Sequence, residues 1–186
     1  MQAILKKEVG QDAIAAKIAA ASIFMSLTVL SGFIRIPVPM SPVPVTMQTF
    51  FVLLSGAWLG GPLASASQIG YLALGILGAP VFSSFGSGFL YLAGPTGGYM
   101  AGFVLAAFIT GRFARCAGRS FAGLLALFII CDGIILFCGA LWLKVLTGYD
   151  AARIIQVGIL PFIPGDLLKA AGAAAAYKAF GPGNKF

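Results

Sequence analysis

The chain has 186 residues, of which 60% are hydrophobic and only 9% are charged. Its mean hydropathy of +1.00 excludes an ordinary water-soluble domain and predicts an integral membrane protein. The net charge of +7 does not indicate a nucleic-acid partner, because the basic residues lie scattered at the ends of apolar runs rather than massed in one patch. The chain contains no histidine, the usual general base and commonest metal ligand, and we expect no metal and no cofactor.

Six apolar runs are candidates for transmembrane helices, at about 20 residues for each crossing of the lipid bilayer. They cover residues 13–34, 45–60, 62–79, 98–112, 120–146 and 165–180. A tight turn at Gly60-Gly61-Pro62 separates the second from the third, because proline belongs in the first turn of a helix. The sequence therefore predicts an all-α membrane protein of about six transmembrane helices, forming a single polytopic domain over residues 1–186.

The distribution of basic residues predicts the orientation, since lysine and arginine are more frequent on the cytoplasmic side of a membrane. With the N-terminus inside, the inner helix ends carry Lys6, Lys7, Lys17, Arg112, Arg115, Arg119, Lys178 and Lys185, and the outer side carries Arg35, Lys144 and Arg153. Both termini are therefore expected in the cytoplasm. The connections 35–44 and 79–97 and the start of the last helix are then expected on the outer face.

Small residues recur at four-residue spacing in the first predicted helix. The segment AIAAKIAAAS pairs Ala15 with Ala19 and Ala16 with Ala20. Small side chains let two helices approach closely in lipid. This stripe indicates either packing within the chain or docking of a separate membrane partner.

The second predicted helix and the connection after the third contain candidates for a ligand pocket. Gln48 is an amide within an apolar run, and it needs either a ligand or a neighbouring helix as a hydrogen-bond partner. The segment 82–103, FSSFGSGFLYLAGPTGGYMAGF, combines glycines that let the backbone approach a ligand with aromatic side chains that can wall an apolar pocket. Its candidates are Phe82, Phe85, Gly88, Phe89, Tyr91, Gly97 and Tyr99.

Asp132 is a charged residue near the middle of the fifth predicted helix. An ionisable residue at that depth is expensive to insert and often functional. A structural hydrogen bond to a neighbouring helix explains it equally well.

The last predicted helix opens with Asp166 and Lys169, in a chain that otherwise avoids charge. Pro161, Pro164 and Gly165 predict that it begins at Asp166, whose carboxylate suits a helix N-terminus. Lys169 opposes the helix dipole, and a lysine in hydrocarbon costs about 2.5–3.5 kcal/mol. The two residues form either a salt bridge that merely neutralises both, or a ligand site. In such a site Asp166 accepts hydrogen bonds from ligand N–H groups and Lys169 meets an acceptor or carboxylate.

Motifs for catalysis are absent from the sequence. It contains no phosphate-binding G-x-x-x-x-G-K-[ST], no G-x-S-x-G and no H-E-x-x-H, so the chain is not itself an ATPase. A substrate-binding transport subunit is therefore the leading interpretation. The alternatives are a small intramembrane enzyme that acts on a lipid-soluble substrate with Asp132 or Asp166 as the base, and a structural scaffold that binds no small molecule.

Three motifs together resemble the BioY family, the biotin-binding S components of energy-coupling factor (ECF) transporters. They are VPVTMQTF at 43–50, YLAGPTGGY at 91–99 and PGDLLKA at 164–170. The resemblance implies a six-helix S component of the bacterial cytoplasmic membrane that takes up biotin through an outward-facing site. It also implies two kinds of partner, a transmembrane T protein and two ATPase subunits that hydrolyse ATP.

The resemblance also implies roles for individual residues. Asp166 and Lys169 become the polar anchors for biotin, with Gln48 and the 82–99 segment as the remaining wall, and the stripe of Ala15, Ala16, Ala19 and Ala20 faces the T protein. A basic residue or an amide is expected in 82–92 for the polar ends of the ligand, but the polar side chains there are Ser83, Ser84, Ser87 and Tyr91. The ligand carboxylate is thus left without an assigned partner.

Overall fold

The computed structural model describes residues 2–118 and 120–182, so Arg119 and Lys185, assigned above to the cytoplasmic side, lie outside the described residues. Each of the six predicted segments is helical. The helices are α1 (Gln2–Gly32), α2 (Gln48–Leu59), α3 (Gly61–Ile76), α5 (Gly97–Ala117), α6 (Phe121–Thr147) and α8 (Ile163–Phe180). The prediction of an all-α membrane fold is therefore confirmed.

Shorter elements that the sequence did not predict lie between these helices. An antiparallel hairpin pairs β1 (Arg35–Ile36) with β2 (Val45–Thr46). The connection after α3 holds a 3-10 turn, η1 (Ser83–Phe85), and the single-turn helix α4 (Phe89–Leu92). The connection before α8 holds α7 (Ala151–Gly158), whose first turn is capped by the Asp150 carboxylate accepting a hydrogen bond from the backbone N–H of Arg153 at 2.8 Å.

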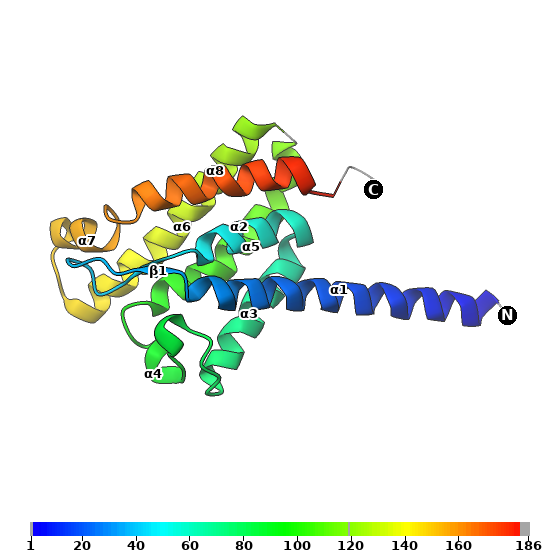
Figure 1. Cartoon of the computed structure of the whole chain (residues 1–186), viewed down its shortest axis with the longest axis horizontal. Helices are drawn as coiled ribbons and strands as arrows, with labels where there is room; N and C mark the ends of the chain where they lie inside the picture. Colours follow the sequence, from blue (N-terminus) through cyan, green and yellow to red (C-terminus); the bar gives the residue numbers. More distant parts are fainter. Residues whose placement is uncertain (1, 119, 183–186) are drawn as a thin grey trace.

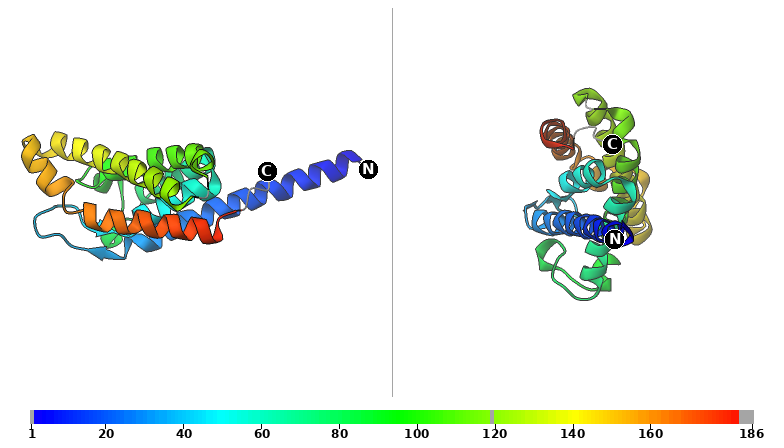
Figure 2. Two further views of the ribbon diagram at one scale, coloured as in Figure 1. Left: turned by 90° about the horizontal axis from the view of Figure 1, so that it is seen from above. Right: turned by 90° about the vertical axis from the view of Figure 1, so that its right-hand side faces the viewer.

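The long helices form one bundle with α2 near its centre, in contact with α1, α3, α5 and α8. Both termini lie at the same end of the bundle, and the β1–β2 hairpin and α7 lie at the opposite end (Figure 1). The N-terminal half of α1 runs out beyond the other helices (Figure 2). This arrangement agrees with two termini on one side of the membrane, and their cytoplasmic location stays a prediction.

The number of membrane spans is also still a prediction. Among the described helices, three are long and apolar enough to cross a membrane, over Asp12–Gly32, Gly97–Ala117 and Phe121–Thr147, and α7 with α8 makes a fourth if this pair, bent by 50°, is one span. Helix α2, with 12 residues, is about 18 Å long, which is shorter than the roughly 30 Å of hydrocarbon.

Helix α1 begins at Gln2 rather than residue 13, so it extends beyond the apolar run. Two other predicted helix starts were wrong for identifiable reasons. Helix α8 begins at Ile163 rather than Asp166, because Pro164 occupies its first turn, where a missing N–H costs nothing. The backbone N–H of Asp166 accordingly donates to the Phe162 carbonyl at 2.9 Å. Helix α2 begins at Gln48 rather than residue 45, because Val45 and Thr46 pair with β1.

Glycine allows α5 to pack closely against α6. A Cβ atom placed on Gly98 would lie 2.2 Å from the Cβ of Trp142 and 2.6 Å from the Cys138 carbonyl oxygen. No real Cβ atom tolerates such contacts, so only glycine permits this distance between the two helix axes. This close approach fixes the N-terminal end of α5, which carries part of the site described next.

Candidate ligand-binding site

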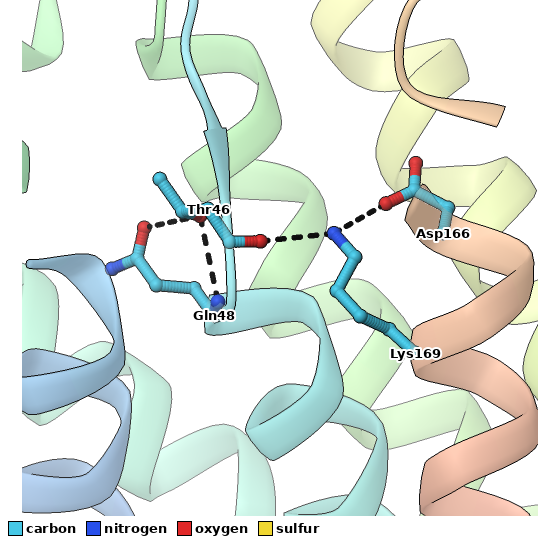
Figure 3. A network of polar contacts seen from close by, with 4 residues as sticks. All are labelled: Thr46, Gln48, Asp166 and Lys169. Atoms are coloured by element: carbon cyan, nitrogen blue, oxygen red, sulfur yellow. Dashed lines mark hydrogen bonds and ion pairs between the residues drawn. The ribbon is translucent and has the colours of Figure 1, made fainter. Parts of the chain in front are cut away.

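Asp166 and Lys169 form a buried ion pair at the start of α8. The Lys169 Nζ lies 2.5 Å from the Asp166 Oδ1, and only 8% of Lys169 and 5% of Asp166 is exposed. The same Nζ donates a hydrogen bond to the Thr46 carbonyl at 2.9 Å (Figure 3). The lysine is thus held by an anion and by a carbonyl, which offsets the cost of burying its charge. It also links α8 to the hairpin at strand β2.

Gln48 takes part in a polar network next to this pair. Its Nε2 donates to the Tyr71 hydroxyl at 2.8 Å and to the Thr28 carbonyl at 3.3 Å, and its Oε1 accepts from the Thr46 hydroxyl at 3.2 Å. Gln48 therefore makes the interhelical hydrogen bonds that the sequence left as one alternative. It also fixes Thr46, whose carbonyl holds Lys169 (Figure 3).

A cavity lies between the hairpin, α2, α5, α6 and the start of α8. Its polar wall includes Thr46, Gln48, Thr49, Asp166 and Lys169. The remaining lining consists of Val43, Pro44, Ser83, Tyr91, Thr96, Tyr99, Met100, Phe103, Ile135, Leu136 and Phe162. A cavity with one charged corner and a largely apolar surround suits a ligand that has a polar head on an apolar ring system.

The apolar wall is built from aromatic side chains of α5 and the segment before α8. The rings of Tyr99 and Phe162 lie 5.6 Å apart, and Phe103 follows Tyr99 one helical turn later. The Tyr99 hydroxyl donates to the Gly158 carbonyl at 2.7 Å, which ties α5 to the end of α7. The Tyr99 ring can therefore contact a ligand while its polar end is already satisfied.

One buried polar atom of the cavity lining, the Thr49 Oγ1, lacks a hydrogen-bond partner among the described residues. Buried polar atoms are normally paired, and leaving one unpaired costs about 1–3 kcal/mol. The Thr49 hydroxyl is therefore available to a polar ligand, whereas the Asp166 Oδ1 already lies 2.5 Å from the Lys169 Nζ.

The central space is narrow, at about 50 Å³. That volume holds a few water molecules, whereas sites for small organic ligands span roughly 300–1,000 Å³. A ligand of that size must push parts of the wall aside. The short hairpin and the connection with η1 and α4 contribute Thr46, Ser83 and Tyr91 to the wall, and both segments lie outside the long helices.

Asp132 of α6 extends this charged cluster, although it does not line the cavity. Only 4% of Asp132 is exposed, and its side chain interacts with both Asp166 and Lys169. Its Oδ1 has no hydrogen-bond partner in the described part of the chain. The structure thus places Asp132 beside the Asp166–Lys169 pair, and its functional and structural alternatives both stay predictions.

The predicted site residues divide into two groups. Asp166, Lys169, Gln48, Tyr91 and Tyr99 line one cavity. The structure places the other five predicted ligand contacts, Phe82, Phe85, Gly88, Phe89 and Gly97, outside its lining.

Phe82 lies one layer behind the cavity wall. It is fully buried, with its ring 5.0 Å from that of Tyr91 and 5.5 Å from that of Tyr71. The Tyr91 hydroxyl donates to the Ser83 carbonyl at 3.1 Å, and partial burial raises the pKa of Tyr91. Phe82 therefore supports a neutral tyrosine that itself faces the cavity.

The remaining four residues shape the loops around the cavity. Phe85 and Phe89 are exposed by 70% and 66%. Gly88 adopts φ +84°, a conformation natural to glycine, and Gly97 starts α5 where a Cβ atom would lie 1.7 Å from the Leu92 carbonyl oxygen. The glycines are thus required by turns and packing, and the two phenylalanines face away from the protein interior.

Sequence reasoning missed much of the lining, notably Thr49, Phe103, Ile135, Leu136 and Phe162. A usable signal existed for Phe103, which shares a helix face with Tyr99, and for Thr49, which follows Gln48. For Ile135, Leu136 and Phe162 the sequence offers no such signal, because apolar residues occur throughout this chain.

Most of the alanine stripe of α1 is not used for packing within the chain. Ala15, Ala16 and Ala19 are exposed and Ala20 is half-buried. Ala16 and Ala20 line a groove of about 490 Å³ at the end of the bundle away from the cavity. The internal-packing alternative therefore fails for at least three of the four residues.

Known proteins resemble this chain over most of its length. The BioY family model matches residues 4–183. The Biotin transporter BioY of Thermotoga maritima is 42% identical over 154 residues, which are 83% of this chain and 89% of the relative. The Probable biotin transporter BioY of Pyrococcus horikoshii is 39% identical over 159 residues, covering 86% and 92% of the two chains.

A solved structure shares the fold. The crystal structure at 2.1 Å of the S-component for biotin from an ECF-type ABC transporter superposes with a TM-score of 0.84 at 24% sequence identity, covering 90% of this chain and 92% of the other. Family membership and the apolar helices make this a multi-pass protein of the cell membrane. With a family match over nearly the whole sequence and relatives around 40% identical, the chain belongs to the BioY family.

Proposed function

We propose that this chain is the high-affinity, substrate-specific S component for biotin uptake by an ECF-type, ATP-dependent importer, acting as a single polytopic membrane domain. The observation that carries the proposal is the buried Asp166–Lys169 pair on the wall of an otherwise largely apolar cavity. Relatives over most of the chain are named biotin transporters, which supports the same substrate. The family is one of transport proteins, and the alternative of an intramembrane enzyme is set aside.

Biotin has the chemistry that this cavity favours. Its ureido group carries two N–H donors and one carbonyl acceptor, its fused rings are apolar, and its side chain ends in a carboxylate. Asp166 accepts a hydrogen bond from a ureido N–H, Lys169 donates to the ureido carbonyl, and the unpaired Thr49 hydroxyl supplies a further contact. The rings then lie against Tyr99, Phe103 and the other apolar residues, at about 25 cal/mol per Å² of apolar area buried.

Binding requires the wall to rearrange, because the space of about 50 Å³ is too small for the ligand. A ureido group between Asp166 and Lys169 would replace part of their contact, including the hydrogen bond from Lys169 to the Thr46 carbonyl. Because Thr46 belongs to strand β2, occupancy of the site is mechanically linked to the hairpin at this end of the bundle.

The energy for uptake comes from partners in this proposal. A transmembrane T protein and two ATPase subunits hydrolyse ATP and switch the S component between outward-open and inward-facing orientations. The exposed stripe of Ala15, Ala16 and Ala19 on α1 supports a close approach by a partner helix.

Isothermal titration of biotin into the purified, detergent-solubilised chain tests the proposal. We expect saturable binding at a 1:1 ratio. Lipoic acid is the matched control, since it has an apolar ring and a carboxylate tail but no ureido group, and it should not compete. The absence of saturable biotin binding at micromolar ligand would contradict the function and favour the scaffold alternative.

A further inference from the structure

A second, more open cavity of about 500 Å³ adjoins the first. Pro44, Tyr91 and Thr96 line both cavities, so these three residues form a shared boundary. Its lining also includes Arg35 of β1, Ser84 of η1 and residues of the hairpin loop such as Ser41. The second cavity therefore extends the first toward the end of the bundle that carries the hairpin.

Arg35 is the positively charged residue that lines this second cavity. It lies in β1 opposite Thr46 of β2, the residue whose carbonyl accepts a hydrogen bond from Lys169. The short hairpin therefore connects the two cavities, because it carries Arg35 on β1 and binds Lys169 through Thr46 on β2. Lys169 is already engaged by Asp166 and Thr46, whereas Arg35 is exposed.

One N–H group of Arg35 is engaged by the loop that faces it. The Nη1 donates to the Ser84 hydroxyl oxygen. A guanidinium has five N–H donors in a planar fork, so donors remain for another acceptor. This fixed, partly satisfied arginine can form two parallel hydrogen bonds to a carboxylate.

The loop that carries Ser84 adopts an unusual backbone conformation. Ser84 and Phe85 have φ angles of +64° and +59°, in the left-handed region that residues other than glycine rarely adopt. The Phe85 ring stacks on Phe33 at a centroid distance of 4.6 Å, which helps to hold this conformation. Such backbone strain concentrates at functional sites, and here it places the Ser84 hydroxyl on Arg35.

We propose that Arg35 is the partner of the ligand carboxylate, a role that no residue of the 82–92 segment can fill with a charge. The inference rests on the proposed function. With the ureido head between Asp166 and Lys169, the side chain of biotin passes the boundary of Pro44, Tyr91 and Thr96 and places its carboxylate at the Arg35 guanidinium. The carboxylate then stays close to water, and Arg35 discriminates acids from neutral analogues.

The test compares biotin with its primary carboxamide, which keeps the rings and the side chain but has no charge. Both ligands are titrated into the unmodified chain and into Arg35→Ala. We expect Arg35→Ala to weaken biotin binding by roughly two- to fivefold, since exposed charge pairs contribute modestly, and to leave the affinity for the carboxamide unchanged. Arg153→Ala removes another exposed cation, on α7, and should affect neither ligand.

The carboxamide also reports whether the variant is folded, because it needs the inner cavity but not Arg35. Equal losses for both ligands, or no loss for either, would overturn the assignment of Arg35 while leaving biotin transport intact. Binding of neither ligand by the unmodified chain would overturn the proposed function and this inference together.

Discussion

The two ends of the bundle differ in which side chains they bury and which they expose. At the end with the hairpin, the charged side chains of Asp166 and Lys169 point inward and are buried beside a cavity. At the end with the termini, the small side chains of Ala15, Ala16 and Ala19 point outward and are exposed. In the function proposed here, the ligand is therefore recognised inside the bundle at one end, and the partner protein is recognised on the surface at the other end.

The largest effect is expected from breaking the buried pair at the ligand end. Lys169→Ala leaves the Asp166 carboxylate buried without its cation, which costs about 3–5 kcal/mol of stability. Biotin affinity should fall more than tenfold, or about 1.4 kcal/mol. Asp166→Asn, which keeps the shape of the side chain, should lose at least as much affinity with less loss of stability.

Thermal unfolding in detergent and biotin titration measure the two effects. Lys144→Ala, an exposed lysine in the last turn of α6, is the control and should change neither quantity. Wild-type affinity in both Lys169→Ala and Asp166→Asn would mean that the pair only stabilises the fold.

A smaller loss of stability is expected from enlarging a buried glycine at the ligand end of the bundle. Gly98→Ala should lower stability by about 1–3 kcal/mol, because the new Cβ atom would lie 2.2 Å from the Cβ of Trp142. Gly133→Ala in α6 is the matched control, since a Cβ atom there meets nothing within 4 Å. Equal melting temperatures for the two variants would show that α5 and α6 do not approach as closely as described.

The smallest effect on the isolated chain is expected at the opposite end. Ala16→Leu should leave the melting temperature and biotin affinity unchanged, because the site is exposed. Assembly with the T protein should weaken roughly tenfold, since a bulky side chain prevents close helix approach. Co-purification of the T protein with the unmodified and variant chains measures this, and an undiminished complex would argue against the stripe as the docking surface.

The sequence predicted the helices better than their ends. Long apolar runs identify α1, α5 and α6, because burial in lipid needs the same composition everywhere along a span. The start of α8 was predicted too late, because the first turn of a helix tolerates a proline and Pro164 lies there. The hairpin was not predicted, because two strands of two residues each leave almost no pattern in a proline-rich segment.

The site was predictable only where it is polar. Asp166, Lys169 and Gln48 stand out in an apolar chain, and the cavity includes all three. Ile135 and Leu136 line the same cavity, but nothing in their sequence context separates them from residues that face lipid. Phe85 and Phe89 had the expected chemistry for an apolar wall, yet both side chains are exposed, in a loop with a left-handed backbone at Ser84 and Phe85 and a turn at Gly88.

The central claim is that Asp166 and Lys169 bind the ligand as well as each other, and a double-mutant cycle tests it most directly. Melting temperature and biotin affinity are measured for Asp166→Asn, Lys169→Ala, the double variant and the unmodified chain. We expect the double variant to recover most of the stability lost by Lys169→Ala, because no charge is left unpaired, and still to bind biotin more than tenfold more weakly. A stable double variant with unchanged biotin affinity would contradict the claim.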